Sequence, residues 1–231
     1  MEFTRALIKG KFEKRYKRFF ADIKVNKETI TAHCPNTGSM KGLLDVNNEA
    51  WISRNDNPKR KLKYTLEIIK VKKNLVGVNT HFANKIVYHG LSNNLINELN
   101  NNQNIKPEVF FNKETRFDFL VKKNNQKIFV EVKNVTLFRK DKISEFPDAI
   151  TSRGSKHLKT LIDAIKKGYK SYTIFLVQIQ GIEYFKIAKD IDKEYYQNYI
   201  TAKKAGVNFL AYRCKISPKE IRIEKKLKII D

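Results

Sequence analysis

Residues 114–137, ETRFDFLVKKNNQKIFVEVKNVTL, contain two short runs of aromatic and β-branched residues separated by a polar turn. Such runs are typical of strands that have a buried face. One carboxylate interrupts each run, Asp118 in FDFLV and Glu131 in IFVEV. A buried carboxylate is costly unless a cation or hydrogen-bond donors hold it, so these two positions need a chemical explanation.

The turn between the two runs predicts which residues face each other. Asn tolerates a positive φ, so Asn124 and Asn125 suit a two-residue hairpin loop. Stepping outward from that loop one residue at a time places Asp118 opposite Glu131, with Cβ atoms about 4.5–5.5 Å apart. Side chains two residues apart on a strand share a face, so Lys133 is expected beside Glu131.

Two interpretations of this acidic pair remain open. In the first, the pair belongs to a lattice of ion pairs on a half-exposed sheet, because the same register places Arg116 opposite Lys133. In the second, Asp118 and Glu131 are the ligands of a divalent cation, and their hard oxygen atoms favour Mg²⁺ or Mn²⁺ over Zn²⁺. The catalytic residues are then Asp118, Glu131 and Lys133, with Lys133 orienting the attacking water and balancing negative charge.

The charge of the chain indicates a polyanionic partner. Lys and Arg number 47 against 24 Asp and Glu among 231 residues, a net charge of +23. A composition rich in Lys, Asn and Ile accounts for part of this excess, but such a bias should raise Glu as well. The remainder favours nucleic acid over an anionic membrane. Cations mixed with aromatic rings, or placed near a helix start, give the expected nucleic-acid-binding residues: Arg15, Lys17, Arg18, Lys59, Arg60, Lys61, Arg153 and Lys156.

Cysteine usage and hydropathy bear on the compartment. The two cysteines, Cys34 and Cys214, form no CxxC motif, which suits a reducing environment. No uninterrupted apolar run approaches the roughly 20 residues that span a bilayer, and the basic N-terminal stretch lacks the apolar core of a secretory signal. We therefore expect a cytoplasmic protein that does not associate with membranes.

The pattern of elements changes near Val78. Before it, short strands with turn residues between them suggest a small barrel. After it, we expect a helix over residues 80–100, the hairpin, and a helix that begins near Gly154 and stops at Gly168. A strand over residues 172–178, a helix over residues 192–205 that stops at Gly206, and a last strand are expected to follow. His157 lies at the edge of the apolar face of the second helix, where packing is expected and a role near the metal stays open. The fold class is thus α/β (α+β), with domains at residues 1–79 and 80–231.

Stretches in order along nearly the whole chain resemble the sugar fermentation stimulation protein family. The string HCPNTGSM is long and unusual, and RFDFL followed by VEVK resembles the D…(D/E)xK signature of the PD-(D/E)xK nuclease-like fold. The matching stretches are RYKRFFADI (15–23), HCPNTGSMKGLL (33–44), NPKRK (57–61), YTLE (64–67), GVNT (77–80), TRFDFL (115–120), VEVKNVTL (130–137), FPDAITSRGSKHL (146–158) and GV…AY (206–212).

The resemblance implies a fold and a function. It implies an N-terminal OB-fold-like barrel that binds nucleic acid, a C-terminal PD-(D/E)xK nuclease-like domain, DNA binding, and a bacterial or archaeal source. It places the acidic pair at Asp118 and Glu131 and the lysine at Lys133. One departure lies at residues 87–91, where an acidic helix residue is expected as an extra metal ligand and the sequence has VYHGL. Glu114 is the weak substitute.

Three functions are compatible with the sequence. The first is a DNA nuclease that uses Mg²⁺ or Mn²⁺ to hydrolyse phosphodiester bonds. The second is a DNA-binding regulator of sugar metabolism genes that does not cleave, built on a nuclease scaffold. The third is an RNA-binding module, which a barrel permits. Whether the DNA is duplex or single-stranded, and whether the protein is a homodimer, stay open.

Overall fold

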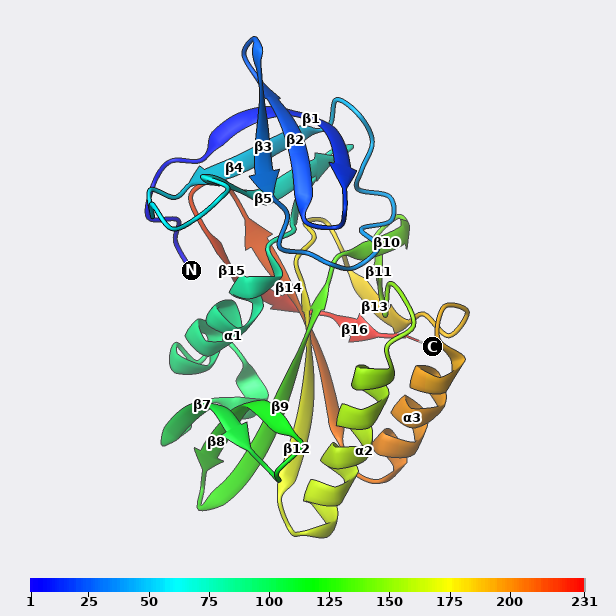
Figure 1. Ribbon diagram of the computed structural model, residues 1–231. Helices are drawn as coiled ribbons and strands as arrows, with labels where there is room; N and C mark the ends of the chain where they lie inside the picture. Colours follow the sequence, from blue (N-terminus) through cyan, green and yellow to red (C-terminus); the bar gives the residue numbers. More distant parts are fainter. Residues whose placement is uncertain (231) are drawn as a thin grey trace.

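Short strands near the N-terminus close into the barrel that the sequence predicts (Figure 1). The strand order is β3-β2-β1-β4-β5, and a parallel pairing of His33 with Thr65 joins β3 to β5 and closes the barrel. A further strand, β6, pairs with β5. The bounds are β1 (Ile8–Tyr16), β2 (Phe20–Val25), β3 (Glu28–His33), β4 (Glu49–Arg54), β5 (Tyr64–Val71) and β6 (Asn74–Gly77).

The second half of the chain is built on a six-stranded mixed sheet of order β15-β14-β12-β9-β8-β7. The three central strands β9, β12 and β14 run parallel to one another, and the outer strands are antiparallel to their neighbours. The bounds are β7 (Asn104–Phe110), β8 (Arg116–Lys123), β9 (Gln126–Val135), β12 (Lys170–Val177), β14 (Asn208–Ile216) and β15 (Ile221–Lys226).

A smaller four-stranded sheet lies beside the large one. Its order is β10-β11-β13-β16, with bounds β10 (Leu137–Lys140), β11 (Ile143–Phe146), β13 (Tyr184–Ile187) and β16 (Lys228–Ile229). Arg139 joins two carboxylates, Glu145 and Asp190, and stabilises this sheet at its edge. The computed structural model from which these elements are taken describes residues 1–230.

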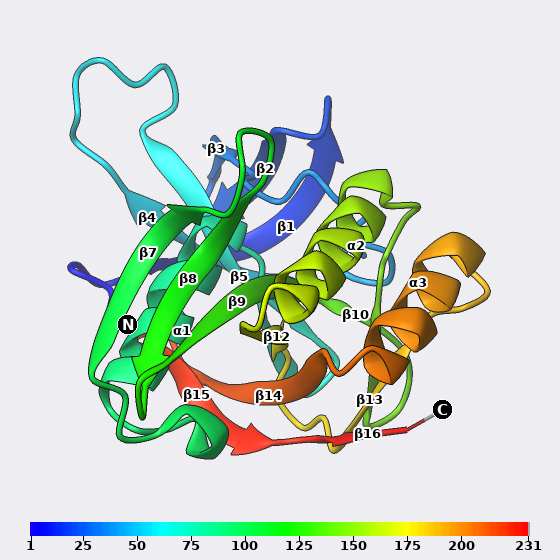
Figure 2. The same cartoon turned by 90° about the horizontal axis from the view of Figure 1, so that it is seen from below.

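Helices cover both faces of the large sheet (Figure 2). Helix α1 (Ala83–Ser92) packs on one face, where Ile86 and Val87 join a buried cluster with Val130. Helices α2 (Ser152–Lys166) and α3 (Lys193–Lys204) pack on the other, where the buried cluster includes Leu161 and Phe175. No helix within residues 1–230 combines the length and the apolar character that crossing a membrane requires.

The first helix is much shorter than the sequence pattern predicts. A 3₁₀ turn (Thr80–Phe82) precedes α1, the helix ends at Ser92, and a second 3₁₀ turn follows at Asn97–Leu99. Asn94 adopts a φ of 56°, and the N–H of Leu95 returns to the carbonyl of Gly90, a helix ending that the left-handed Asn permits. The predicted stops of the other two helices are confirmed, since Gly168 and Gly206 have φ of 83° and 97°.

The hairpin register is confirmed as far as one pair short of the acidic residues. Asn124 and Asn125 both have positive φ, and the ladder runs from Lys123–Gln126 to Phe119–Val130. There β8 and β9 separate, so Asp118 does not pair with Glu131 in the ladder. The predicted opposition of Arg116 and Lys133 is wrong, because Arg116 lies opposite Phe110 on β7 and Lys133 lies opposite Phe175 on β12.

Candidate metal centre

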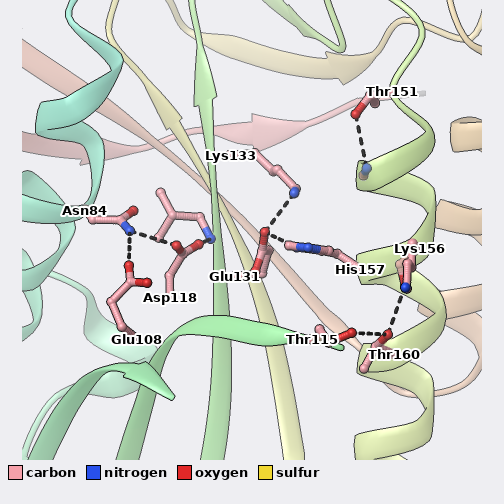
Figure 3. Close-up of polar contacts among 12 residues, drawn as sticks. Asn84, Glu108, Thr115, Asp118, Glu131, Lys133, Thr151, Lys156, His157 and Thr160 are labelled. Carbon is pink, nitrogen blue, oxygen red and sulfur yellow. Dashed lines mark hydrogen bonds and ion pairs between the residues drawn. The ribbon is translucent and has the colours of Figure 1, made fainter. Parts of the chain in front are cut away.

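Two carboxylates and a lysine come together where β8 and β9 separate, between helices α1 and α2 (Figure 3). Asp118 comes from β8, and Glu131 and Lys133 come from β9. Asp118 is half-buried and Glu131 is buried with 4 % of its surface exposed. The site therefore has the low solvent access that makes the charge of each carboxylate matter.

Donors from two elements hold the Asp118 carboxylate. Asn84 on α1 donates from Nδ2 to Oδ1 at 2.7 Å, and the backbone N–H of Val132 donates to Oδ2 at 2.7 Å. Burial, followed by the nearby charge of Glu131, nevertheless raises the pKa of Asp118 to about 6. The Asp118 side chain thus replaces the missing strand partner of the Val132 amide, which explains why the ladder stops there.

Glu131 is held by Lys133 and His157 on the α2 side of β9. Lys133 Nζ donates to Oε1 at 2.8 Å, and Nδ1 of His157 on α2 contacts the same oxygen. Burial alone would raise the pKa of Glu131, but the charges of Lys133 and His157 outweigh it and hold that pKa below its usual value. The carboxylate is therefore ionised at neutral pH.

One of the four carboxylate oxygens of Asp118 and Glu131 has no hydrogen-bond partner in the described residues. Glu131 Oε2 is buried and has no hydrogen-bond partner within residues 1–230. A buried carboxylate oxygen without a partner is costly, and a bound cation is one of the few groups that satisfies it. The ligand types also fit a hard divalent cation, since the site offers carboxylates and the Val132 carbonyl. That carbonyl points to the same edge of β9 as the Val132 N–H.

In this geometry the Asp118 and Glu131 carboxylates would have to turn toward each other before one cation could bind both. In Figure 3 the Asp118 carboxylate faces Asn84 and the Glu131 carboxylate faces Lys133 and His157, so the two point to opposite helices. No group of three or more His, Cys, Asp or Glu side chains is arranged to hold a metal ion in the part of the chain described. A cation bound by both carboxylates would therefore keep open positions for water and substrate.

An amide contacts Asp118 from the helix on which the resemblance leads one to expect an acidic third ligand. Helix α1 brings Asn84, not an acid, to Asp118, and the 87–91 segment contributes no side chain to this contact. Glu114 does not substitute for it, because Glu114 is exposed and pairs with Lys156 at 2.7 Å. The sequence pattern missed Asn84, since an Asn early in a helix is ordinary. His157 was visible as a polar residue at an apolar helix edge.

The two predicted cations at the start of α2 differ in whether an acidic side chain pairs with them. Arg153 is exposed and has no hydrogen bond or ion pair with the residues that the structure describes, whereas Lys156 is tied to Glu114. Thr151 caps the helix by accepting from the Gly154 N–H at 3.1 Å. Arg153 lines a cleft of about 430 Å³ together with Lys133 and the turn at residues 36–38.

The predicted cations of the barrel lie in its loops, apart from Arg15 near the end of β1. Lys17 and Arg18 are exposed in the β1–β2 turn, where both have positive φ. Arg15 donates to the Asn36 carbonyl at 2.7 Å and so joins this turn to the 36–38 turn. In the loop between β4 and β5, Arg60 donates to Thr65 Oγ1 at 3.0 Å, and its neighbours Lys59 and Lys61 are exposed.

Comparison with known proteins places this architecture in a family. The profile "SfsA N-terminal OB domain" matches residues 14–78, and the profile "Sugar fermentation stimulation protein RE domain" matches residues 81–220. The chain is 77 % identical to a sugar fermentation stimulation protein homolog of Pelagibacter ubique, with both chains fully covered. It is 42 % identical to a homolog of Pseudoalteromonas atlantica, again over 100 % of both chains.

A solved structure shares the fold. "The structure of Pyrococcus Furiosus SfsA in complex with Ca2+" superposes with a TM-score of 0.89 at 24 % identity, covering 100 % of this chain and 98 % of that one. The barrel, the sheet flanked by helices and the sequence matches agree along the chain. The chain belongs to the sugar fermentation stimulation protein family.

Proposed function

We propose that this protein binds DNA and hydrolyses its phosphodiester bonds with a divalent cation, Mg²⁺ or Mn²⁺, held by Asp118 and Glu131. The observation that carries the proposal is the buried, unpartnered Glu131 Oε2 beside a second carboxylate and a lysine. The fold relative whose title names a complex with Ca²⁺, also a hard divalent cation, is consistent with it.

Each side chain has a distinct role in this mechanism. A cation bound at the two carboxylates would lower the pKa of a coordinated water and neutralise charge on the scissile phosphate. Lys133, with 12 % of its side chain exposed, pairs with Glu131 and would face the negative charge that develops on the phosphate. Asn84 and His157 are positioning residues, because each holds one carboxylate and neither is needed to contact the DNA.

The cleft beside Lys133 offers a path for the DNA strand. Lys133 and the free Arg153 line it together, so a phosphate seated on Arg153 brings the backbone to the lysine. The net charge of +23 favours this encounter at long range. Arg15, Lys17 and Arg18 extend the cationic surface onto the barrel, next to the 36–38 turn that forms the opposite wall.

A second candidate function is a DNA-binding regulator that does not cleave. The observation that favours it is that three of the four carboxylate oxygens are already satisfied by protein donors: both of Asp118, by Asn84 and Val132, and Oε1 of Glu131. A cation would have to displace or share those hydrogen bonds. Such a self-satisfied site suits a scaffold that grips DNA without hydrolysing it.

Cleavage assays on duplex, single-stranded and branched DNA, with Mg²⁺ and with Mn²⁺, separate the two candidates. Glu131→Ala should abolish cleavage while leaving DNA affinity in EDTA unchanged. Glu183→Gln, which removes an exposed carboxylate paired with Lys142, serves as the matched control and should cleave normally. Cleavage that persists in Glu131→Ala removes this centre from the mechanism, and no cleavage by the wild type on any substrate supports the regulator.

A further inference from the structure

A second cavity, of about 620 Å³, lies at the junction of the barrel and helix α1, on the other side of the 79–82 turn from the cleft that holds Lys133. The N-terminal segment, the loop between β4 and β5, and the start of α1 enclose it. Its volume is in the range of small-molecule sites. The proposed cleavage mechanism uses none of its residues.

The inner wall of the cavity carries a buried acceptor. Glu67 on β5 has 2 % of its surface exposed. Its Oε1 accepts a hydrogen bond from Ser53 Oγ at 2.6 Å, and its Oε2 accepts one from Asn79 Nδ2 at 2.8 Å. An amide nitrogen only donates, so Oε2 is an acceptor. Burial raises the pKa of Glu67, while the hydrogen bonds from Ser53 and Asn79 and the charge of Arg60 oppose that rise. Each carboxylate oxygen has a second lone pair for a ligand donor.

Cations line the opening of the cavity. Arg5 and Arg54 share the single carboxylate of Asp56, which offsets one of their two charges. Arg60 forms no ion pair within residues 1–230 and donates only to the Thr65 hydroxyl, although its charge acts on Glu67. Lys85 lies over the Phe82 ring at 5.7 Å and likewise lacks an acidic partner in the described chain. Two cations are thus free to hold an anionic group at the entrance.

Rings also line the cavity. His33 and His81 lie with ring centroids 6.4 Å apart, and Phe82 lines the same cavity. Nucleobases stack on His and aromatic rings. A ligand that matches the cations, the rings and the buried acceptor has an anionic end, a flat ring and a row of hydrogen-bond donors.

We propose that this cavity binds a guanine nucleotide, with the phosphate on Arg60 and Lys85 and the base on Glu67. A carboxylate accepts two hydrogen bonds from the N1–H and N2–H₂ donors of guanine, whereas adenine and cytosine offer only one amino group beside an acceptor. Thymine places its single N–H between two carbonyls, which a carboxylate repels. The nucleotide is either free or a guanine in a single DNA strand.

Calorimetry on the full-length protein in EDTA tests the chemistry without requiring any cleavage. We expect dGMP to bind about ten-fold more tightly than dAMP, dCMP or dTMP, the discrimination typical of one bidentate contact. Glu67→Gln should remove this preference, and Arg60→Ala should weaken all four nucleotides. Lys27→Ala, in the β2–β3 turn at the far end of the barrel, is the control and should change nothing.

Histidine NMR locates the ligand even if Glu67→Gln fails to fold. The chain has four histidines, and dGMP should shift the rings of His33 and His81 but not those of His89 and His157. An oligo(dT) strand with one central dG should shift the same two rings if the source is a DNA strand, and should leave them unmoved if it is the free nucleotide. Three results would each overturn the proposal. They are equal affinity for dGMP and dTMP, a preference for dGMP that survives Glu67→Gln, and an NMR shift on dGMP binding at the His157 ring alone.

Discussion

Asn84 on helix α1 and Asp118 on strand β8 are joined by a 2.7 Å hydrogen bond from the amide Nδ2 to the carboxylate Oδ1. This contact directs Oδ1 of Asp118 toward α1, while Oδ2 accepts from the Val132 N–H (Figure 3). An amide at this place orients a carboxylate without adding charge, whereas an acid would add a third anionic ligand. We therefore expect the identity of residue 84 to influence how strongly the proposed centre attracts a cation.

Substitutions at Asn84 should move metal affinity in opposite directions. Asn84→Ala releases Asp118, and loss of such a positioning contact is expected to weaken Mn²⁺ binding by about ten-fold. Asn84→Asp adds a carboxylate, so it should strengthen Mn²⁺ binding and destabilise the metal-free protein through like-charge repulsion. Calorimetric titration with Mn²⁺ and urea unfolding in EDTA measure the two effects. Weaker Mn²⁺ binding by Asn84→Asp would show that residue 84 does not face the cation.

The raised pKa of Asp118 predicts a pH dependence with a definite sign. The pKa rises from 3.8 to about 6, so the folded metal-free protein holds this proton more tightly than the unfolded chain does. The contribution of Asp118 to stability is therefore lost as the pH rises from about 4 to about 6. Divalent cations compete with the same proton, so Mn²⁺ affinity should fall by up to ten-fold per unit below about pH 6.

Asp118→Asn isolates that effect. Its amide removes the titration, and the Asn84 amide can turn over to preserve the hydrogen bond between them. The stability of Asp118→Asn relative to wild type in EDTA should therefore be higher at pH 7 than at pH 4. Asp163→Asn, an exposed substitution on α2, is the control. A relative stability that is the same at both pH values for Asp118→Asn would contradict a raised pKa at this site.

The sequence predicted the parts of the site that depend on strand periodicity. The Asn124–Asn125 turn, the register up to Phe119 and the proximity of Lys133 to Glu131 follow from local rules and are confirmed. The ladder fails at Asp118 because its carboxylate takes the Val132 N–H in place of a strand partner. Strand periodicity counts backbone partners and cannot anticipate a side chain that substitutes for one.

Contacts between distant elements were beyond those rules. Asn84 is 34 positions from Asp118, and His157 is 26 positions from Glu131. Their meeting depends on how α1 and α2 dock on opposite faces of one sheet, which no local pattern encodes. The overlong prediction for the first helix has a similar origin, because Leu95 and Leu99 continue the apolar spacing although the left-handed Asn94 has already ended the helix.

The Lys133–Glu131 pair should contribute strongly to stability through the burial of Glu131. Lys133→Met leaves a buried carboxylate with only His157 beside it, and breaking such a pair is expected to cost about 3 kcal/mol at neutral pH. Adding Glu131→Gln to Lys133→Met should recover most of that loss. Urea unfolding of the single and double variants measures the coupling.

An exposed pair elsewhere provides the comparison for that cycle. Lys142 and Glu183 are 3.0 Å apart, with about half of each side chain exposed. Lys142→Met should therefore cost at most about 1 kcal/mol. If Lys133→Met costs no more than Lys142→Met, Glu131 does not depend on the lysine charge.

Arg153 and Lys156 should contribute unequally to DNA binding although they lie three residues apart on α2. Arg153 is free in the cleft, so Arg153→Ala should weaken binding and reduce the slope of log affinity against log salt by about 1. Lys156 must first leave Glu114, so Lys156→Ala should have the smaller effect.

Glu114→Gln frees Lys156 and should strengthen binding. Glu194→Gln removes the same charge beside Lys159 and should strengthen binding less. Fluorescence anisotropy across a salt series measures all four, and equal gains from the two glutamate variants would mean that net charge, not the position of Lys156, sets the affinity.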